Sequence, residues 1–234
     1  MTEGSRPARS EREAAAEHLL GHSFARPELL IEALTHRSAA YGKGSGKGSN
    51  ERLEFVGDRV LGLLVAEWLA ERFPSEREGA LGRRLAALVS QPVLAGIAEA
   101  VALAQVIDVA PNEAKAGVKR RATVLADALE AVIGALFLDG GLEPARTFVR
   151  RAYEPVLAAQ PSPPKDPKTA LQEWAQARGL DLPFYILAER HGPPHAPAFS
   201  ITVTLVGRTG AGSAGTKREA ERLAAADLLS QLPS

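Results

Sequence analysis

The chain has 234 residues, enough for one large domain or two modest ones, and it carries 28 basic and 28 acidic side chains. Without a basic excess, the net charge gives no support for a nucleic-acid partner. The absence of cysteine excludes disulfides, thiolate catalysis and cysteine-ligated zinc sites. The first ten residues are polar, and polar side chains interrupt the most apolar long window, residues 85–110. We therefore expect no secretory signal and no membrane span, and we predict a soluble, cytoplasmic protein.

Helical periodicity and a composition rich in Ala, Leu, Glu and Arg extend through residues 10–157, without an alternating strand pattern. The predicted helices cover residues 11–20, 27–35, 51–73, 78–88, 91–101, 115–138 and 142–153. A flexible polar tail, residues 1–9, precedes them. Residues 42–49 are rich in glycine and predict a flexible loop, whose two lysines either touch a phosphate backbone or only keep the loop soluble. Asn50 follows this loop at a position suited to capping the next helix.

A proline-rich linker, residues 158–164, separates this domain from residues 165–234. Beyond the linker the pattern changes, and it predicts in turn a helix, three strands and a helix: residues 168–178, 184–190, 198–206, 208–212 and 216–231. This order is typical of a compact α+β module. We therefore predict a multidomain protein in which an all-α domain, residues 10–157, precedes a small α-β-β-β-α domain.

Two helical segments hold carboxylates among apolar side chains. Glu51, Glu54 and Asp58 stand at i, i+3 and i+7 and therefore share one helix face, and Asp127 and Glu130 share a face of a second helix. Carboxylates in a low-dielectric surrounding repel one another unless a cation compensates them, and all-oxygen clusters suit Mg²⁺. A solvated charged face is the commoner origin of such spacings, but the apolar neighbours leave little room for it. The sequence therefore predicts a carboxylate metal site between two helices.

These residues and several further motifs resemble the ribonuclease III family. Residues 50–58 (NERLEFVGD) look like the family's nine-residue motif. The other matches in the first domain are residues 34–38 (LTHRS), 77–79 (REG) and 126–134 (ADALEAVIG). The second domain resembles the double-stranded-RNA-binding domain of bacterial members, on residues 166–173 (DPKTALQE), 192–195 (GPPH) and 216–221 (TKREAE). The resemblance covers residues 10–232 in the family's domain order.

The resemblance implies roles for six acidic side chains. Four of them match the family's ligands of catalytic Mg²⁺, for which Mn²⁺ is an expected substitute: Glu54, Asp58, Asp127 and Glu130. Among these, Asp58 and Glu130 match the pair held most essential. Glu51 and Glu78 match auxiliary acidic positions that assist substrate or subunit contacts, and a solvated position is the alternative for both.

The resemblance also implies two partners, double-stranded RNA and a second copy of the chain. The side chains expected to contact RNA are Thr169, Gln172, Glu173, His195, Lys217 and Arg218. Eight basic and seven acidic side chains follow residue 164, so we expect weak, salt-sensitive binding by this domain alone. Because a duplex has two strands and one chain supplies one acidic cluster, we expect a C₂ homodimer. Phe55 matches an aromatic that the family inserts into the partner subunit, the alternative being an ordinary core position.

The histidines offer no metal-free route to RNA cleavage. His18 and His22 have a possible metal-binding spacing, although a surface position is favoured, and His36 is expected to order its loop. The predicted function is Mg²⁺-dependent hydrolysis of double-stranded RNA, leaving 5′-phosphate and 3′-hydroxyl ends, in the processing of ribosomal RNA precursors and structured messenger RNAs. A catalytically inactive RNA-binding or ribosome-associated relative is the alternative, disfavoured because all six acidic positions are occupied.

Overall fold

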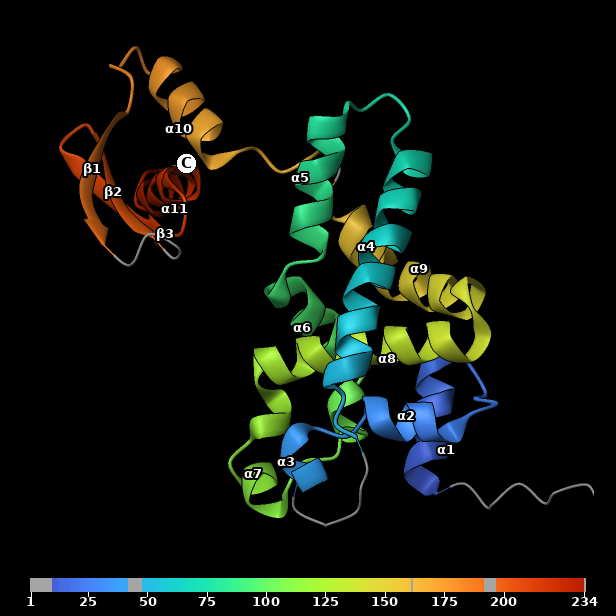
Figure 1. Ribbon diagram of the computed structural model, residues 1–234. Helices are drawn as coiled ribbons and strands as arrows, with labels where there is room; N and C mark the ends of the chain where they lie inside the picture. The colour runs from blue at the N-terminus through green and yellow to red at the C-terminus, as the bar shows by residue number, and fades with distance from the viewer. Residues whose placement is uncertain (1–9, 42–47, 161, 192–196, 234) are drawn as a thin grey trace, which may run out of the picture. The chain divides into compact units, whose positions relative to one another are not determined.

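The computed structural model describes residues 10–41, 48–160, 162–191 and 197–233, and it divides the chain into two compact units, Met1–Pro163 and Pro164–Ser234 (Figure 1). Each unit encloses its own apolar core. The predicted fold class, an all-helical domain followed by an α-β-β-β-α module, is confirmed. The finer domain boundaries at residues 157 and 165 stay a prediction, and the expected tail, residues 1–9, lies outside the described residues. Among the helices that the structure describes, none has the length and apolar character needed to cross a membrane.

The first unit is built around one apolar helix. Its helices are α1 (Glu11–Leu20), α2 (Pro27–Ala33), α3 (Arg37–Tyr41), α4 (Glu51–Arg72), α5 (Glu78–Leu88), α6 (Gln91–Ala100), α7 (Pro111–Lys115), α8 (Ala122–Gly140) and α9 (Leu142–Ala158), with single turns η1 (Leu103–Gln105) and η2 (Val118–Arg120). Helix α8 is buried almost all round because α2, α4, α6 and α9 pack against it (Figure 1). A helix that is apolar on every side is stable only in such surroundings.

The prediction of one helix over residues 115–138 is wrong at its start. The chain instead forms α7, turns at Gly117, passes through η2 and begins α8 at Ala122. Gly117 has a φ of +71°, the left-handed conformation that glycine adopts at low cost and that an α-helix cannot contain. The helical composition on both sides of Gly117 concealed this break.

Asn50 precedes α4 as predicted, but the expected side-chain cap is wrong. Among the described residues its side chain forms no capping hydrogen bond to the first turn of α4. Asn50 is 4% exposed, and its backbone N–H donates to the carbonyl oxygen of Thr35 at 2.9 Å. Asn50 therefore occupies the N-cap position of α4, but it joins the start of this helix to the end of α2 through its backbone and not through a side-chain cap.

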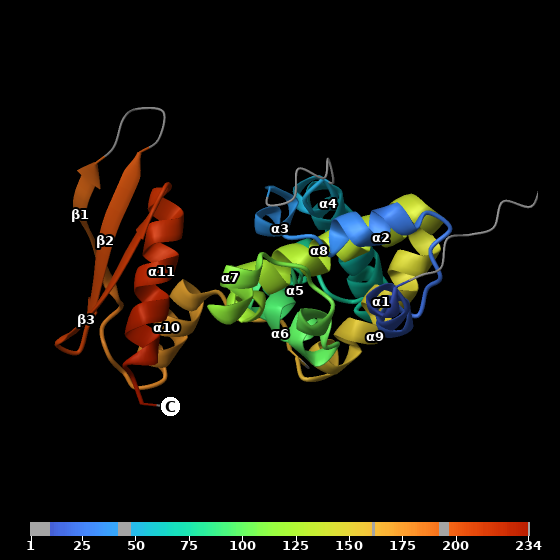
Figure 2. The ribbon, with the colours of Figure 1, turned by 90° about the horizontal axis from the view of Figure 1, so that it is seen from below.

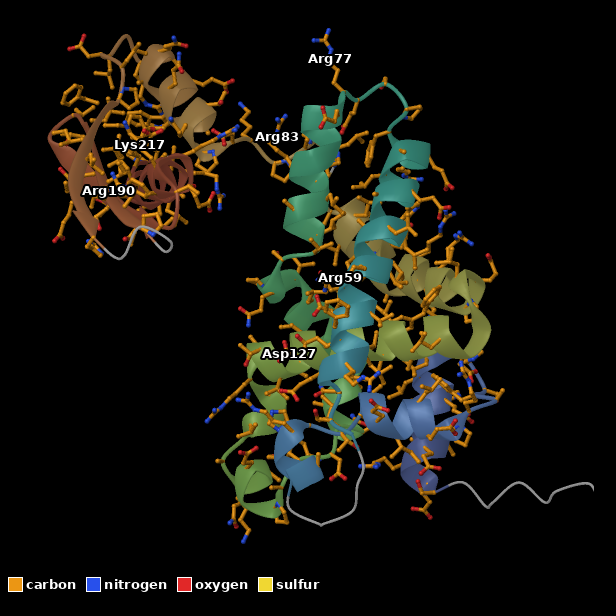
Figure 3. The ribbon with its side chains drawn as sticks, in the orientation of Figure 1. Arg59, Arg77, Arg83, Asp127, Arg190 and Lys217 are labelled. Carbon is orange, nitrogen blue, oxygen red and sulfur yellow. The ribbon has the colours of Figure 1, made fainter. Side chains whose placement is uncertain are left out.

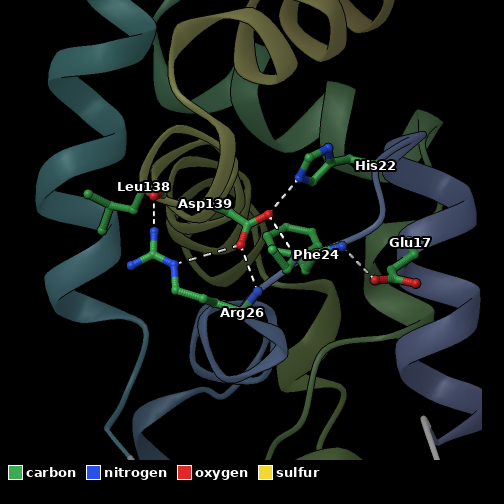
Figure 4. Close-up of polar contacts among 7 residues, drawn as sticks. Glu17, His22, Phe24, Arg26, Leu138 and Asp139 are labelled. Carbon is green, nitrogen blue, oxygen red and sulfur yellow. Dashed lines mark hydrogen bonds and ion pairs between the residues drawn. The ribbon is translucent and has the colours of Figure 1, made fainter. Parts of the chain in front are cut away.

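The expected surface position of His22 is also wrong (Figure 4). Its Nε2 lies 2.8 Å from Oδ2 of Asp139, whose side chain is 2% exposed. Asp139 also accepts the backbone N–H groups of Ala25 and Arg26 at 3.1 and 2.8 Å. Burial alone would raise the pKa of Asp139, but these hydrogen bonds outweigh it and hold the pKa below its usual value. The contacts attach the loop between α1 and α2 to the end of α8.

In the second unit, the described residues form a three-stranded antiparallel sheet with two helices on one face (Figure 2). The elements are α10 (Pro167–Gln176), β1 (Phe184–His191), β2 (Ala198–Leu205), β3 (Arg208–Ala214) and α11 (Lys217–Ser230), and their ends alone differ from the prediction. Helix α11 lies very close to β3. A Cβ added at Gly210 or Gly212 would stand only 2.4 Å from a carbonyl oxygen of α11, so neither position has room for a side chain. Two glycines therefore set the spacing between helix and sheet.

Candidate metal centre and RNA-binding surface

Helices α4 and α8 cross in direct backbone contact, and this contact positions the acidic residues. A Cβ at Gly57 of α4 would lie 1.8 Å from the carbonyl oxygen of Glu130. A Cβ at Gly134 of α8 would lie 2.3 Å from the carbonyl oxygen of Leu53. Sequence reasoning included both glycines in motifs without assigning them a role. An isolated glycine inside an apolar helical run is the signal that could have identified a close approach of two backbones.

The crossing brings three of the predicted ligands together, and Figure 3 labels one of them, Asp127, on α8. Glu54 of α4 and Asp127 and Glu130 of α8 each offer a carboxylate oxygen within 4.8 Å of the other two, and all three side chains are partly buried. Within the described residues, Asp58 does not belong to this group. Its Oδ2 instead accepts a hydrogen bond from Nη1 of Arg59 at 2.9 Å, and its side chain is 53% exposed.

The three carboxylates form a negative cluster whose charge neighbouring cations compensate only in part. Burial, followed by the charges of Asp58, Glu54 and Asp127, raises the pKa of Glu130 to about 7, against a small opposing effect of Arg59. Burial, followed by the charges of Asp127, Glu51 and Asp58, raises the pKa of Glu54 above its usual value. A divalent cation would relieve this repulsion, and hard all-oxygen ligands from two helices fit Mg²⁺.

Burial also raises the pKa of Asp127, although two basic residues at the start of α3 oppose the effect. They are His36 and Arg37. His36 is held by its backbone N–H, which donates to the carbonyl oxygen of Asp108 at 2.9 Å, and by a 2.9 Å hydrogen bond between its Nδ1 and Oγ of Ser38. These contacts agree with the predicted structural role of His36 in ordering its loop.

The two auxiliary acidic residues occupy different places. Glu51 is exposed at the start of α4, accepts a hydrogen bond from Oγ of Ser49 at 2.6 Å, and contributes to the raised pKa of Glu54. Glu78 is exposed at the first position of α5 and lies outside the group of three carboxylates. Glu51 is therefore electrostatically part of the cluster, whereas Glu78 is not among the carboxylates that the described residues bring together.

Phe55 lies outside the core of its unit. Its side chain is 62% exposed on α4, which excludes the alternative of an ordinary core phenylalanine. The guanidinium of Arg59, one turn further along α4, lies 3.9 Å from the centre of the Phe55 ring. Covering this ring with another surface would remove its apolar area from water, which is favourable.

In the second unit, five of the six predicted RNA contacts are exposed, and His195 lies outside the described residues. Thr169, Gln172 and Glu173 lie on α10, and Lys217 and Arg218 begin α11. The exposed position of all five is required of residues that contact a duplex, while their role in binding stays a prediction.

Local contacts shape both helix starts. Thr216 caps α11, because its hydroxyl accepts the backbone N–H of Glu219 at 3.2 Å. The start of α11 therefore presents the positive end of the helix dipole together with the cations of Lys217 and Arg218. Lys165 donates to Oε2 of Glu173 at 2.5 Å. Lys168 donates to Oε2 of Glu221 at 2.5 Å and is therefore engaged within the domain.

Comparisons with known proteins agree with this architecture. Residues 26–157 match the family model described as ribonuclease-III-like, and residues 167–232 match the double-stranded RNA binding motif. "Ribonuclease 3" of Dinoroseobacter shibae is 46% identical over 92% of this chain and 93% of its own length. "Ribonuclease 3" of Rhodopseudomonas palustris is 48% identical over 93% of this chain and 80% of its own length.

Solved structures give the same assignment for the first unit. The nuclease domain of ribonuclease III from Campylobacter jejuni is 39% identical, with a TM-score of 0.57, over 65% of this chain and 99% of that one. A second structure of that domain is 41% identical, with a TM-score of 0.55, over 62% of this chain and 96% of that one, and is described by flexibility in a region involved in dimer formation. From its two matched domains and its close full-length relatives, the chain belongs to the ribonuclease III family.

Proposed function

We propose that this protein is a Mg²⁺-dependent endoribonuclease that hydrolyses both strands of double-stranded RNA and leaves 5′-phosphate and 3′-hydroxyl ends. The observation that carries the proposal is the convergence of Glu54, Asp127 and Glu130 at the crossing of α4 and α8, in a chain that also has a double-stranded RNA binding motif. Ribosomal RNA precursors and structured messenger RNAs in the cytoplasm are the proposed substrates.

Four carboxylates would hold the metal. Glu54, Asp127 and Glu130 form the preassembled part of the site, and Asp58 would complete it after leaving Arg59. Bound Mg²⁺, or Mn²⁺ in its place, would supply an activated water and neutralise charge on the phosphate. The chain's own contribution is a partly buried cluster whose mutual repulsion favours a cation, held by two helices whose glycines fix the distance between them. Glu51 and Glu78 are proposed to act from outside this set.

The second unit would bind the duplex by its shape. A-form RNA presents 2′-hydroxyl groups across its minor groove and phosphates along its backbone. The exposed polar side chains Thr169, Gln172 and Glu173 suit the first kind of contact, and Lys217 and Arg218 at the positive start of α11 suit the second. His195 is proposed as a third contact by family resemblance.

A homodimer would supply the second catalytic site. Each chain contributes one acidic cluster, and a two-fold axis between two copies presents one cluster to each strand. Phe55 is the proposed contact because it is a large apolar side chain left 62% exposed on α4, the helix that also carries Glu54. A partner surface would bury this ring.

The test is incubation of the full chain with a long, perfectly paired RNA duplex in Mg²⁺ or in EDTA, followed by mapping of the ends. We expect 5′-phosphate ends in Mg²⁺ and intact duplex in EDTA. Glu130→Ala should abolish cleavage and leave duplex binding nearly unchanged, and Glu99→Gln, an exposed acid of α6, should cleave normally. Duplex binding without cleavage by the unaltered protein would identify an inactive RNA-binding relative instead. Equal loss of binding and cleavage in Glu130→Ala would contradict a metal-ligand role.

A further inference from the structure

Asp58 and Glu54 stand four residues apart on α4 and so share one helix face, yet Glu54 alone joins the carboxylates of α8. The difference lies in a neighbour. Nη1 of Arg59 donates to Oδ2 of Asp58 at 2.9 Å, and side chains at i and i+1 of a helix do not ordinarily face each other. Arg59 must therefore fold back along α4 to make this contact.

Two further contacts fix the guanidinium of Arg59 in that position. The same Nη1 donates to the carbonyl oxygen of Phe55 at 3.0 Å, and the guanidinium carbon lies 3.9 Å from the centre of the Phe55 ring. An aromatic face attracts such a cation at this distance. The side chain is 60% exposed, so solvent screens the ion pair but the three contacts restrict its geometry.

We propose that Arg59 is a positioning residue that holds Asp58 apart from the other three carboxylates until a divalent cation displaces it. The cation must break the pair between Arg59 and Asp58, so Arg59 weakens metal binding. Asp58 joins the other three carboxylates only when this pair is broken. Because Arg59 also rests on Phe55, it links the proposed subunit contact to the proposed metal site. The inference rests on the proposed function of the acidic cluster.

The test measures metal affinity directly, without RNA. Mn²⁺ has the same preference for oxygen ligands as Mg²⁺, and its free concentration is read from its electron paramagnetic resonance signal during a titration of the full chain. Arg59→Gln should bind Mn²⁺ about two- to fivefold more tightly than the unaltered protein, the range expected for loss of one exposed ion pair. The control is Arg52→Gln, which removes the charge of an exposed arginine on the same face of α4. It should change the affinity for Mn²⁺ less than Arg59→Gln does.

A double-mutant cycle separates action through Asp58 from a general effect of charge. Asp58→Asn removes the negative charge of the ion pair, so adding Arg59→Gln to this variant should tighten Mn²⁺ binding by clearly less than it does in the unaltered protein. Equal tightening in both backgrounds would show that Arg59 acts only through its field on Glu130, and the inference would be overturned.

The outcomes also distinguish this inference from the proposed function. If Glu130→Gln and the unaltered protein bind Mn²⁺ equally, the acidic cluster is not a metal site and both proposals fail. If Glu130→Gln loses binding while Arg59→Gln matches the unaltered protein, the metal site stands and the role of Arg59 is refuted.

Discussion

Gly57 and Glu130 touch through their backbones, and this contact sets how closely α4 approaches α8. A methyl group at position 57 cannot be accommodated by rotating a flexible side chain, because the atom it would meet is a main-chain oxygen. The helices would have to separate or slide. The carboxylates of Glu54 and Glu130 would then move apart with them.

We expect Gly57→Ala to lower the free energy of unfolding by about 1–3 kcal/mol, the usual cost of overpacking a core contact, and to weaken Mn²⁺ binding. Urea unfolding and the Mn²⁺ titration measure the two effects. The control is Gly96→Ala in α6, where an added Cβ meets no atom within 4 Å. It should raise stability by about 0.5–1 kcal/mol, the helix-propensity difference. A Gly57→Ala variant as stable as Gly96→Ala would contradict the close crossing.

The sequence predicts that Glu54 and Asp58 share one helix face and that Asp127 and Glu130 share another, because helical periodicity decides which residues share a face. The position of Asp58 outside the group of three carboxylates could not be predicted, because it depends on the Arg59 side chain folding back along the helix. The contact between His22 and Asp139 joins residues 117 positions apart, and periodicity carries no information about such pairs.

Arg84 illustrates the same limit. A charged residue in α5 predicts a solvated side chain, yet Arg84 is fully buried. Its guanidinium donates to both carboxylate oxygens of Glu76 at 2.7 and 2.9 Å and to the carbonyl oxygen of Gln160 at 2.7 Å, and it stacks on Phe73 at 3.8 Å. Glu76 and Phe73 lie in the segment that precedes α5, but Gln160 is 76 residues away, and periodicity does not predict that these groups meet around one guanidinium.

Phe55→Ala should shift the protein toward monomer in sedimentation velocity. The ring is 62% exposed in the single chain, so its removal should cost little folding stability while it removes apolar contact area from a subunit interface. Leu182→Ala is the matched control, because Leu182 is 58% exposed in the second unit and has no proposed subunit contact. A Phe55→Ala protein that sediments like the unaltered one would remove Phe55 from the interface.

Replacing Lys217 and Arg218 together by alanine should weaken duplex binding and flatten its salt dependence. Each cation that contacts a phosphate releases about one counterion, so the slope of log affinity against log salt concentration should fall in magnitude by about 2. Binding isotherms on a duplex of fixed length, at several KCl concentrations, give this slope.

The control for the pair is Arg208→Gln. Arg208 donates to the carbonyl oxygen of Gln231, which follows the opposite end of α11, and so carries the same charge far from the helix start. Its slope should equal that of the unaltered protein. An unchanged slope in the Lys217 and Arg218 variant would place the phosphate contacts elsewhere on the chain.

Glu130→Gln should stabilise the metal-free protein at high pH and not at low pH. The pKa of Glu130 is about 7 in the folded protein and close to 4.5 in the unfolded chain, so the folded state favours the protonated form. Below pH 4.5 both states hold the proton and Glu130 carries no penalty. As the pH rises to 7 the unfolded state releases its proton first, and the stability contributed by the neutral carboxyl is lost.

Urea unfolding of both proteins in EDTA, at pH 5 and pH 8, measures this effect. The stability advantage of Glu130→Gln should grow between the two pH values, because glutamine cannot ionise and the other titrating groups are common to both proteins. Added Mg²⁺ should reverse the order at pH 8, because the cation compensates the ionised cluster only when Glu130 is present. An advantage that is the same at both pH values would show that Glu130 ionises freely, and the cluster would then lack the repulsion that makes it a cation site.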